Sequence, residues 1–273
     1  MAPFPGAAFA RWPGFRRVKF FLGTHQPSWF RLTDVPLFVS RRRLADRVRL
    51  PRASGPWALD SGGFTELSMF GGWTIDARTY AAEVRRHARI GHLQWAAPQD
   101  WMCEPAVLAA TGLTVAEHQR RTVRNFLALR EMAPDLPWRP VVQGWEPDDY
   151  LRCVDLYDAA GVDLRDYDPV GIGTICRRQD TASGAEIVAR LAGAGLRLHG
   201  FGVKSAGLVR FGAQLASADS LAWSFAERRR RTGLQNDLGA ALRWRANLLG
   251  RLGIETPANE LRALPPAQAS LWG

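Results

Sequence analysis

The stretch WALDSGGF, residues 57–64, contains the pattern from which the fold of this chain can be predicted. A short apolar run leads directly into Asp60 and Ser61, and Gly62 and Gly63 follow. The run is too short for a helix and predicts a buried strand. Glycine lacks a Cβ, so the two glycines permit a tight turn and let a ligand approach the backbone closely. Such a turn is also ordinary turn chemistry, so its meaning depends on how the other strands end.

Seven further short apolar runs predict strands. They are residues 18–23, 36–40, 93–98, 139–144, 169–175, 197–203 and 218–224. All are too apolar for half-exposed antiparallel strands, which indicates burial on both faces. Helical patterns separate most of them, at residues 76–90, 114–132, 148–160, 185–194, 205–215 and 236–252. The second crossover, from Ser40 to Trp57, is short and basic, so a helix there is doubtful.

Strands that alternate with helices predict an α/β protein with a parallel sheet. Eight such units in 273 residues fit a (β/α)8 TIM-like barrel, and a doubly wound open sheet is the main alternative. We expect an N-terminal arm over residues 1–15, a catalytic barrel over residues 16–254 and a C-terminal tail over residues 255–273.

The net charge of +10 suggests a polyanionic partner, most often a nucleic acid. A preference for Arg over Lys can reflect codon usage, but codon usage does not explain the excess of cations over anions. No apolar run approaches the roughly 18 residues of a membrane span, and the N-terminus lacks the order of a secretory signal. We therefore expect a cytoplasmic protein without membrane contact. Cys103, Cys153 and Cys176 are far apart and contain no Cys-x-x-Cys pair, so we expect no structural zinc site.

In a barrel, the carboxyl ends of the strands build the active site. The residues at the predicted ends are His25, Ser40, Asp60, Asp100, Gln143, Gly173, Lys204 and Asp219. Any single Asp in this set could cap the helix that follows its strand. Three carboxylates and one amide at the same rim are more typical of a site. His199, by contrast, lies inside a predicted strand and is interpreted as a core histidine with satisfied hydrogen bonds.

Six segments of the chain resemble, in order, the tRNA-guanine transglycosylase superfamily. They are DSGGF at 60–64, PQD at 98–100, VVQG at 141–144, VGIG at 170–173, GFGV at 200–203 and SADSLAWS at 217–224. The resemblance is closest to the DpdA branch, "deoxypurine in DNA protein A", which inserts 7-deazaguanine derivatives into DNA. The segments span most of the predicted barrel, and their order is more specific than any one of them.

The resemblance implies a role for each matching residue. Asp219 is the expected nucleophile that attacks C1′ of the nucleoside, and Asp60 is expected to move protons on the departing and incoming bases. Asp100 is expected to accept hydrogen bonds from the guanine N1–H and exocyclic amine. The remaining substrate-binding candidates are Ser61 and Gly62 in the first turn, Gln143 and Gly144 at the O6 edge, and Gly171 and Gly173 with backbone amides.

The same chemistry can be argued from the residue types alone. Exchanging a base with retained configuration needs a carboxylate nucleophile that traps the sugar, as in retaining glycosidases. A second carboxylate must transfer a proton, which requires a pKa raised toward the working pH. A third carboxylate can accept two parallel N–H bonds from guanine. No metal or organic cofactor is required, and the co-substrate would be a free 7-deazaguanine similar to preQ0.

Two runs of arginine follow predicted strands on the presumed side of the active site. Extruding the target base costs a few kcal/mol, which phosphate contacts can offset. The candidates for such contacts are Arg41, Arg42, Arg43, Lys204, Arg228, Arg229, Arg230 and Arg231. The alternative interpretation of each run is a solvated helix face.

The chain departs from typical tRNA transglycosylases, which carry a zinc site of three Cys and one His after the nucleophile. No Cys follows Cys176, which favours DNA over tRNA as the substrate and suggests that a partner protein gives access to DNA. Four alternatives stay open: the same exchange on tRNA, a base-excising glycosylase, a non-catalytic nucleic-acid-binding barrel, and an unrelated lyase or aldolase with Lys204 as its Schiff-base residue.

Overall fold

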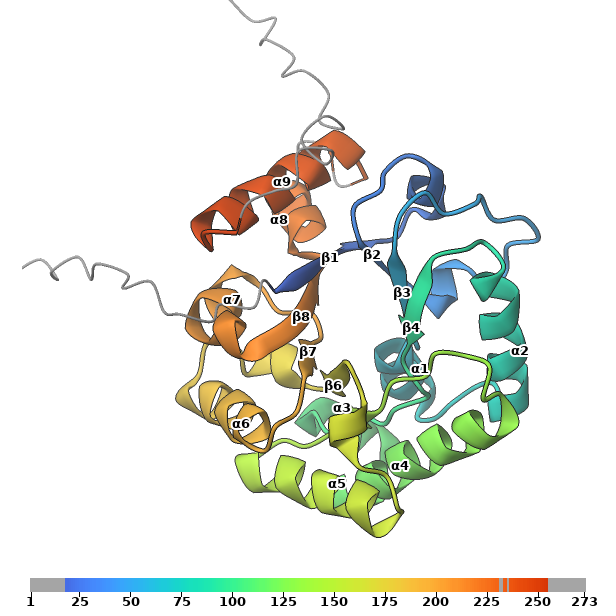
Figure 1. Ribbon diagram of the computed structural model, residues 1–273, viewed down its shortest axis with the longest axis vertical. Coiled ribbons are helices and arrows are strands. Elements are labelled where there is room, and N and C mark those ends of the chain that lie inside the picture. The colour runs from blue at the N-terminus through green and yellow to red at the C-terminus, as the bar shows by residue number, and fades with distance from the viewer. Residues whose placement is uncertain (1–17, 231–232, 235, 255–273) are drawn as a thin grey trace, which may run out of the picture.

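The computed structural model describes residues 18–230, 233–234 and 236–254 (Figure 1). The arm expected over residues 1–15 and the tail expected over residues 255–273 lie outside this part of the chain. Within it, no helix has the length and apolar character needed to cross a bilayer.

A parallel sheet of eight strands forms the centre of the described part of the molecule. The strands are β1 (Lys19–Thr24), β2 (Leu37–Ser40), β3 (Trp57–Asp60), β4 (Leu93–Ala96), β5 (Val141–Val142), β6 (Val170–Ile172), β7 (Leu198–Gly200) and β8 (Leu215–Ser220). Their order is β4-β3-β2-β1-β8-β7-β6-β5, and every pairing is parallel. The sheet curls around a centre with helices outside it (Figure 1), and Ala96 at the end of β4 makes an isolated parallel bridge to Trp138, just before β5. The result is a TIM-like α/β fold.

Helices alternate with the strands over most of the chain. They are α1 (Gly63–Phe70), α2 (Ala77–Ala88), α3 (Pro105–Thr111), α4 (Val115–Met132), α5 (Pro147–Ala159), α6 (Ala182–Gly193), α7 (Ser205–Phe211), α8 (Ala222–Arg230) and α9 (Leu238–Arg251). Helix α4 begins as its sequence predicts, because the Thr114 side chain accepts a hydrogen bond from the Glu117 backbone N–H. The doubtful connection after β2 contains only a single 3-10 turn, Arg41–Arg43.

The last strand lies earlier in the sequence than predicted. We expected residues 218–224, but β8 covers Leu215–Ser220 and α8 already begins at Ala222. The Ser220 hydroxyl accepts the Ala222 backbone N–H, so it forms the turn between the two elements. Ser217 and Asp219 share one face of β8, while Leu215 and Ala218 pack in the core between the sheet and the helices.

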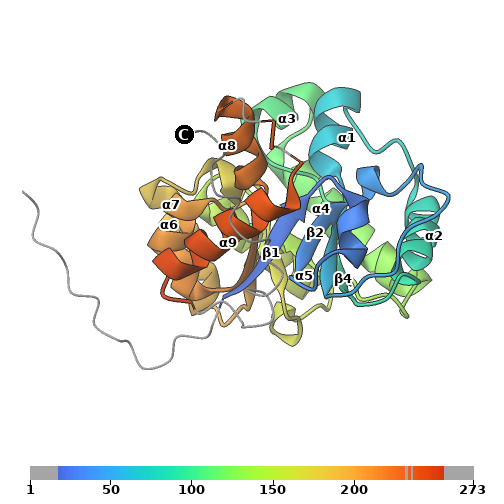
Figure 2. The same cartoon turned by 90° about the horizontal axis from the view of Figure 1, so that it is seen from above.

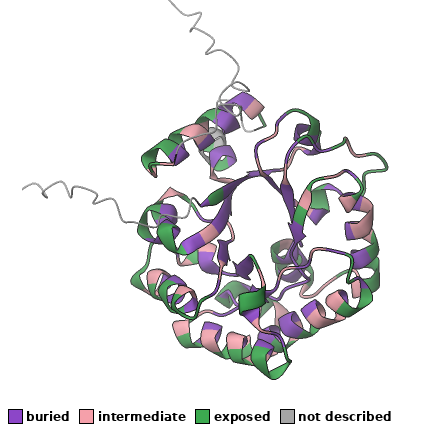
Figure 3. Cartoon of the chain, in the orientation of Figure 1, coloured by how far each residue is buried: buried purple, intermediate pink, exposed green. Residues whose placement is uncertain are grey.

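Most residues of the strands are buried (Figure 3). Most belong to the core between sheet and helices, while a smaller cluster inside the curl contains Phe21, Phe38, Ala58, Trp95 and Ala97, with Phe201 packed against it. This inner cluster fills the interior beneath the carboxyl ends of the strands. Helices α1, α3 and α8, which follow β3, β4 and β8, lie on the same side of the molecule (Figure 2).

Candidate active site

A cavity of about 270 Å³ opens at the carboxyl ends of the strands. Of the eight residues predicted at the strand ends, six line it: His25, Ser40, Asp60, Asp100, Gly173 and Asp219. Gln143 and Lys204 do not. The structure thus brings together three carboxylates from β3, the segment after β4, and β8, separated in sequence by about 160 residues. The cavity volume is close to the lower end of small-molecule pockets, roughly 300 Å³.

Asp60, the last residue of β3, is half-buried on the cavity wall. Burial, followed by the nearby carboxylates of Asp100 and Asp219, raises the pKa of its carboxyl from 3.8 to about 6. Hydrogen bonds from the Ser40 hydroxyl and the Gly62 backbone N–H oppose this effect. A carboxyl with a pKa near 6 can both give and take a proton near neutral pH.

Hydrogen bonds from the buried side chains of Ser61 and Gln143 orient the Asp100 carboxylate. The Ser61 hydroxyl donates to its Oδ1 at 2.9 Å, and the Gln143 amide donates to its Oδ2 at 2.6 Å. The Gln143 Oε1 in turn accepts from the Thr174 hydroxyl at 2.9 Å. Burial raises the pKa of Asp100, and the Ser61 and Gln143 bonds lower it. The carboxylate is therefore fixed in orientation at the cavity wall.

Asp219, near the end of β8, receives two hydrogen bonds on the same oxygen. The Gly202 backbone N–H donates to Oδ1 at 2.9 Å, and His199 Nε2 lies 3.3 Å from it. The residue is 6% exposed and lines the cavity. A carboxylate fixed by one oxygen presents its other oxygen to a ligand.

Several predicted substrate-binding residues lie behind the wall instead of on it. Gln143 and Ser61 are fully buried and hold Asp100. Gly144 and Gly171 are also buried: a Cβ at Gly144 would clash with Asp149 and Tyr150, and one at Gly171 with the Phe201 ring. Gly62, at φ 82°, begins helix α1 and donates its N–H to Asp60.

Gly173 is the one glycine of the VGIG segment on the cavity wall, yet its backbone N–H is already engaged. It donates to the Val142 carbonyl at 3.0 Å, and the Gly171 N–H donates to the Pro140 carbonyl at 2.9 Å. A Cβ at Gly173 would overlap the Gln143 amide. In the structure, these glycines therefore allow Phe201 and Gln143 to pack closely, and both N–H groups serve the sheet.

The cavity wall contains residues that the sequence did not single out. Phe38, Phe64 and Phe201 supply aromatic surface, and Met102, Glu104, Cys176 and Arg177 complete the side toward α3. Phe64 follows the DSGG turn directly and is 43% exposed. Its place next to this turn was the feature of the sequence that could have predicted its position on the cavity wall. Trp29 and Trp223, by contrast, pack against each other in the core.

Cys176 lines the cavity, but burial raises the pKa of its thiol to about 11. It is therefore protonated near neutral pH, which is unfavourable for a nucleophile. Cys103 and Cys153 are buried as free thiols. Across residues 18–230, 233–234 and 236–254, no cluster of His, Cys, Asp and Glu has the arrangement to hold a metal ion.

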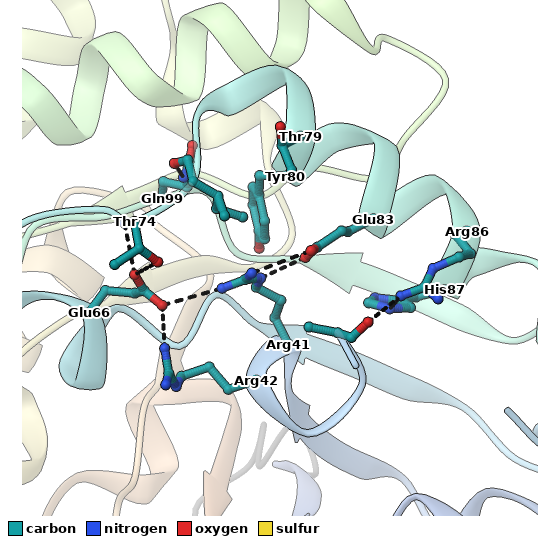
Figure 4. A network of polar contacts seen from close by, with 12 residues as sticks. Arg41, Arg42, Glu66, Thr74, Thr79, Tyr80, Glu83, Arg86, His87 and Gln99 are labelled. Carbon is teal, nitrogen blue, oxygen red and sulfur yellow. Dashed lines mark hydrogen bonds and ion pairs between the residues drawn. The ribbon is translucent and has the colours of Figure 1, made fainter. Parts of the chain in front are cut away.

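The arginines after β2 differ in what they contact (Figure 4). Arg41, predicted to bind nucleic acid, is only 6% exposed and pairs with Glu83 at 2.6 Å and with Glu66 at 3.3 Å. Its guanidinium joins α1 to α2 through these ion pairs, and its burial argues against the predicted contact with a phosphate. Arg42 also pairs with Glu66, while its side chain stays 34% exposed. Arg43 is exposed, with its Nε donating to His25 Nδ1 at 3.1 Å.

Two of the other predicted cations are described with their side chains, and both follow the carboxyl ends of strands, β7 for Lys204 and β8 for Arg229. Lys204 is exposed at the start of α7. Arg229 is exposed on α8, with its guanidinium 5.9 Å from the Phe225 ring centroid. Arg228 and Arg230 belong to the same helix, but their side chains, like the whole of Arg231, lie outside the described part of the structure.

Residues 16–259 match the model of one protein family, DpdA, described as deoxypurine in DNA protein A. No curated protein matches the chain.

Proposed function

The chain belongs to the DpdA family, whose members resemble tRNA-guanine transglycosylases and take part in 7-deazaguanine modification of DNA, and we propose that it is the enzyme that exchanges guanine in DNA for a free 7-deazaguanine. The observation that carries the proposal is the convergence of Asp60, Asp100 and Asp219 on one cavity, with the pKa of Asp60 near 6. Each of the three carboxylates has a different set of contacts, and each set suits a different step.

Asp219 is the proposed nucleophile. Both of its hydrogen bonds reach Oδ1, which leaves Oδ2 to attack C1′ of the nucleotide. The new Oδ2–C1′ bond forms as the C1′–N9 bond breaks, and the bonding electrons leave with the guanine. The sugar is then held as a covalent ester, which preserves configuration after a second displacement.

Asp60 is the proposed acid and base. In its protonated form it gives a proton to the departing guanine, which would otherwise leave as an anion. The resulting carboxylate then takes the proton from the incoming 7-deazaguanine as that base attacks C1′ and releases Asp219. A pKa near 6 keeps both forms accessible near neutral pH.

Asp100 is the proposed guanine-recognising group. Its two oxygens are oriented by Ser61 and Gln143, so it can accept the N1–H and the exocyclic N–H of a purine in parallel. Phe64 and Phe201 supply apolar surface on the same cavity. The DpdA match supports DNA as the substrate; a partner protein that opens the duplex would fit a target base that must leave its stack.

The test is incubation of the purified chain with labelled guanine and either plasmid DNA or bulk tRNA. We expect label in DNA, and a protein–DNA adduct that survives denaturation. Asp219→Asn should lower the exchange rate by about 1,000-fold or more, because an amide oxygen is a poor nucleophile, and should leave DNA binding unchanged.

Three other outcomes would contradict the proposal. Label in tRNA alone would assign the same chemistry to RNA. Abasic sites that accumulate without added base would indicate a glycosylase. Exchange by Asp219→Asn at the wild-type rate would remove Asp219 from the nucleophile role.

A further inference from the structure

We propose that His199 and Ser217 form, with Asp219, a hydrogen-bonded triad that orients the nucleophile and stabilises it as a leaving group. This proposal rests on the proposed function for its role in the reaction, whereas the triad itself can be tested without activity. His199 was interpreted from the sequence as a core histidine with satisfied hydrogen bonds. The structure agrees with its burial, but one of its hydrogen-bond partners is the nucleophile.

The three side chains come from two neighbouring strands. His199 in β7 is the register partner of Ser217 in β8, and Asp219 lies two residues further along β8 on the same face. His199 Nδ1 lies 2.9 Å from Ser217 Oγ, and His199 Nε2 lies 3.3 Å from Asp219 Oδ1. The imidazole ring thus links the Ser217 hydroxyl to the Asp219 carboxylate, which lies nearer the carboxyl end of β8.

The direction of the hydrogen bonds follows from the chemistry of the groups. An ionised carboxylate only accepts hydrogen bonds, so Nε2 must carry the hydrogen that reaches Asp219. Ser217 can then donate its hydroxyl hydrogen to Nδ1, which selects the Nε2–H tautomer. The serine therefore acts on the nucleophile through the histidine, as the third group of a catalytic triad does.

The surroundings of the ring fix its position. His199 is fully buried, and its ring centroid lies 4.7 Å from that of Trp95 and 4.9 Å from that of Phe201, both in edge-on geometry. Phe38 lies at 5.5 Å. The aromatic contacts leave the imidazole little freedom to rotate, so its Nε2 points at Asp219 without reorganisation during the reaction.

The triad has two consequences for the reaction. First, the Gly202 N–H and His199 Nε2 both occupy Oδ1, which assigns Oδ2 as the attacking atom. Second, Oδ1 becomes the carbonyl oxygen of the glycosyl ester. When the incoming base attacks C1′, the C1′–Oδ2 electron pair returns to the carboxylate, and the two donors stabilise that charge. His199 is therefore a positioning residue that is active in both half-reactions.

The kinetic test compares His199→Phe with His199→Gln in the guanine-exchange assay on plasmid DNA. Phenylalanine preserves the aromatic packing but has no hydrogen-bond donor, so we expect kcat to fall about 10- to 100-fold. Removing an oxyanion-hole donor typically costs about 100-fold or more. We expect a smaller loss here because the Gly202 N–H still donates to Oδ1. KM for guanine and DNA binding should not change. Glutamine can place its Nε2 near that of the imidazole, so His199→Gln should recover most of the rate. Wild-type kcat in His199→Phe would overturn the proposal.

A second measurement does not depend on activity. Nitrogen-15 NMR of the imidazole should show His199 as the Nε2–H tautomer, with its signal identified by its loss in His199→Phe. Ser217→Ala should shift the population toward the other tautomer and slow exchange several-fold, which also covers the case that His199→Phe does not fold. If the wild-type chain exchanges no base, the proposed function fails, yet the expected tautomer and its response to Ser217→Ala would still support the triad. An Nδ1–H tautomer, or no response, would overturn it.

Discussion

At the scale of single residues, Asp60 is the carboxyl whose surroundings most clearly favour the protonated form. Its pKa of about 6, against 3.8 in a free side chain, results first from its enclosure and then from Asp100 and Asp219. Ionising Asp60 in the folded protein therefore costs up to about 3 kcal/mol. Placing several carboxylates around one purine-sized cavity thus carries a cost in stability at neutral pH.

This cost predicts that Asp60→Asn stabilises the protein in a pH-dependent way. Because the folded pKa lies above the unfolded pKa, the native state loses stability as the pH rises from about 4 to above 6. The variant does not ionise, so urea unfolding should show it to be up to about 3 kcal/mol more stable than wild type at pH 7.5, and nearly equal at pH 4. Base exchange should be lost. Equal stability differences at both pH values would show that Asp60 has an ordinary pKa.

The sequence allowed the three aspartates to be predicted, because each follows an apolar run and the ends of parallel strands meet at one rim. It did not distinguish a residue on the cavity wall from one behind it. Gln143 and Gly173 both end strands, yet only Gly173 lines the cavity. The sequence predicts that His199 is buried, because it lies inside an apolar strand. It does not predict which polar group of the neighbouring strand forms a hydrogen bond with its ring.

At the scale of elements, Arg41 connects three segments of the chain. It directly follows β2 and forms ion pairs with Glu66 on α1 and Glu83 on α2 (Figure 4). In the sequence it belongs to a run of three arginines, and nothing local separates it from Arg42 and Arg43. Only the return of α1 and α2 to the end of β2 decides which of the three is buried, so the sequence alone could not show it.

Arg41 and Arg43 therefore form a matched pair of variants. Arg41→Ala removes a partner of the fully buried Glu66 and should lower the free energy of unfolding by about 3 kcal/mol. Arg43→Ala changes an exposed residue, so its effect on unfolding should be within about 0.5 kcal/mol, while DNA affinity should fall. Urea unfolding and DNA titration of both variants check this. A loss of DNA affinity in a fully stable Arg41→Ala protein would restore Arg41 as a phosphate ligand.

At the scale of the whole molecule, the alternation of strands and helices was enough to predict the TIM-like parallel fold, since short apolar runs separated by helical patterns permit few other arrangements. The boundaries were less accurate. The expected strand at residues 218–224 was displaced because Leu221–Trp223 is as apolar as a strand, but α8 already begins at Ala222. Such short apolar runs do not distinguish strand from helix.

The net charge of +10 also acts through the whole molecule, but phosphate contacts should be confined to the cavity side. Lys204 and Arg229 are exposed on elements that follow β7 and β8. Each phosphate neutralised should contribute about −0.9 to the slope of log affinity against log salt. Lys204→Ala and Arg229→Ala should therefore each make the slope shallower by about 0.9. Arg165 is the matched control, because it is an exposed arginine in the turn before β6, at the opposite end of the strands. Arg165→Ala should leave the slope unchanged. An equal change of the slope in all three variants would mean that DNA affinity depends only on the total charge of the protein and not on phosphate contacts at the cavity side.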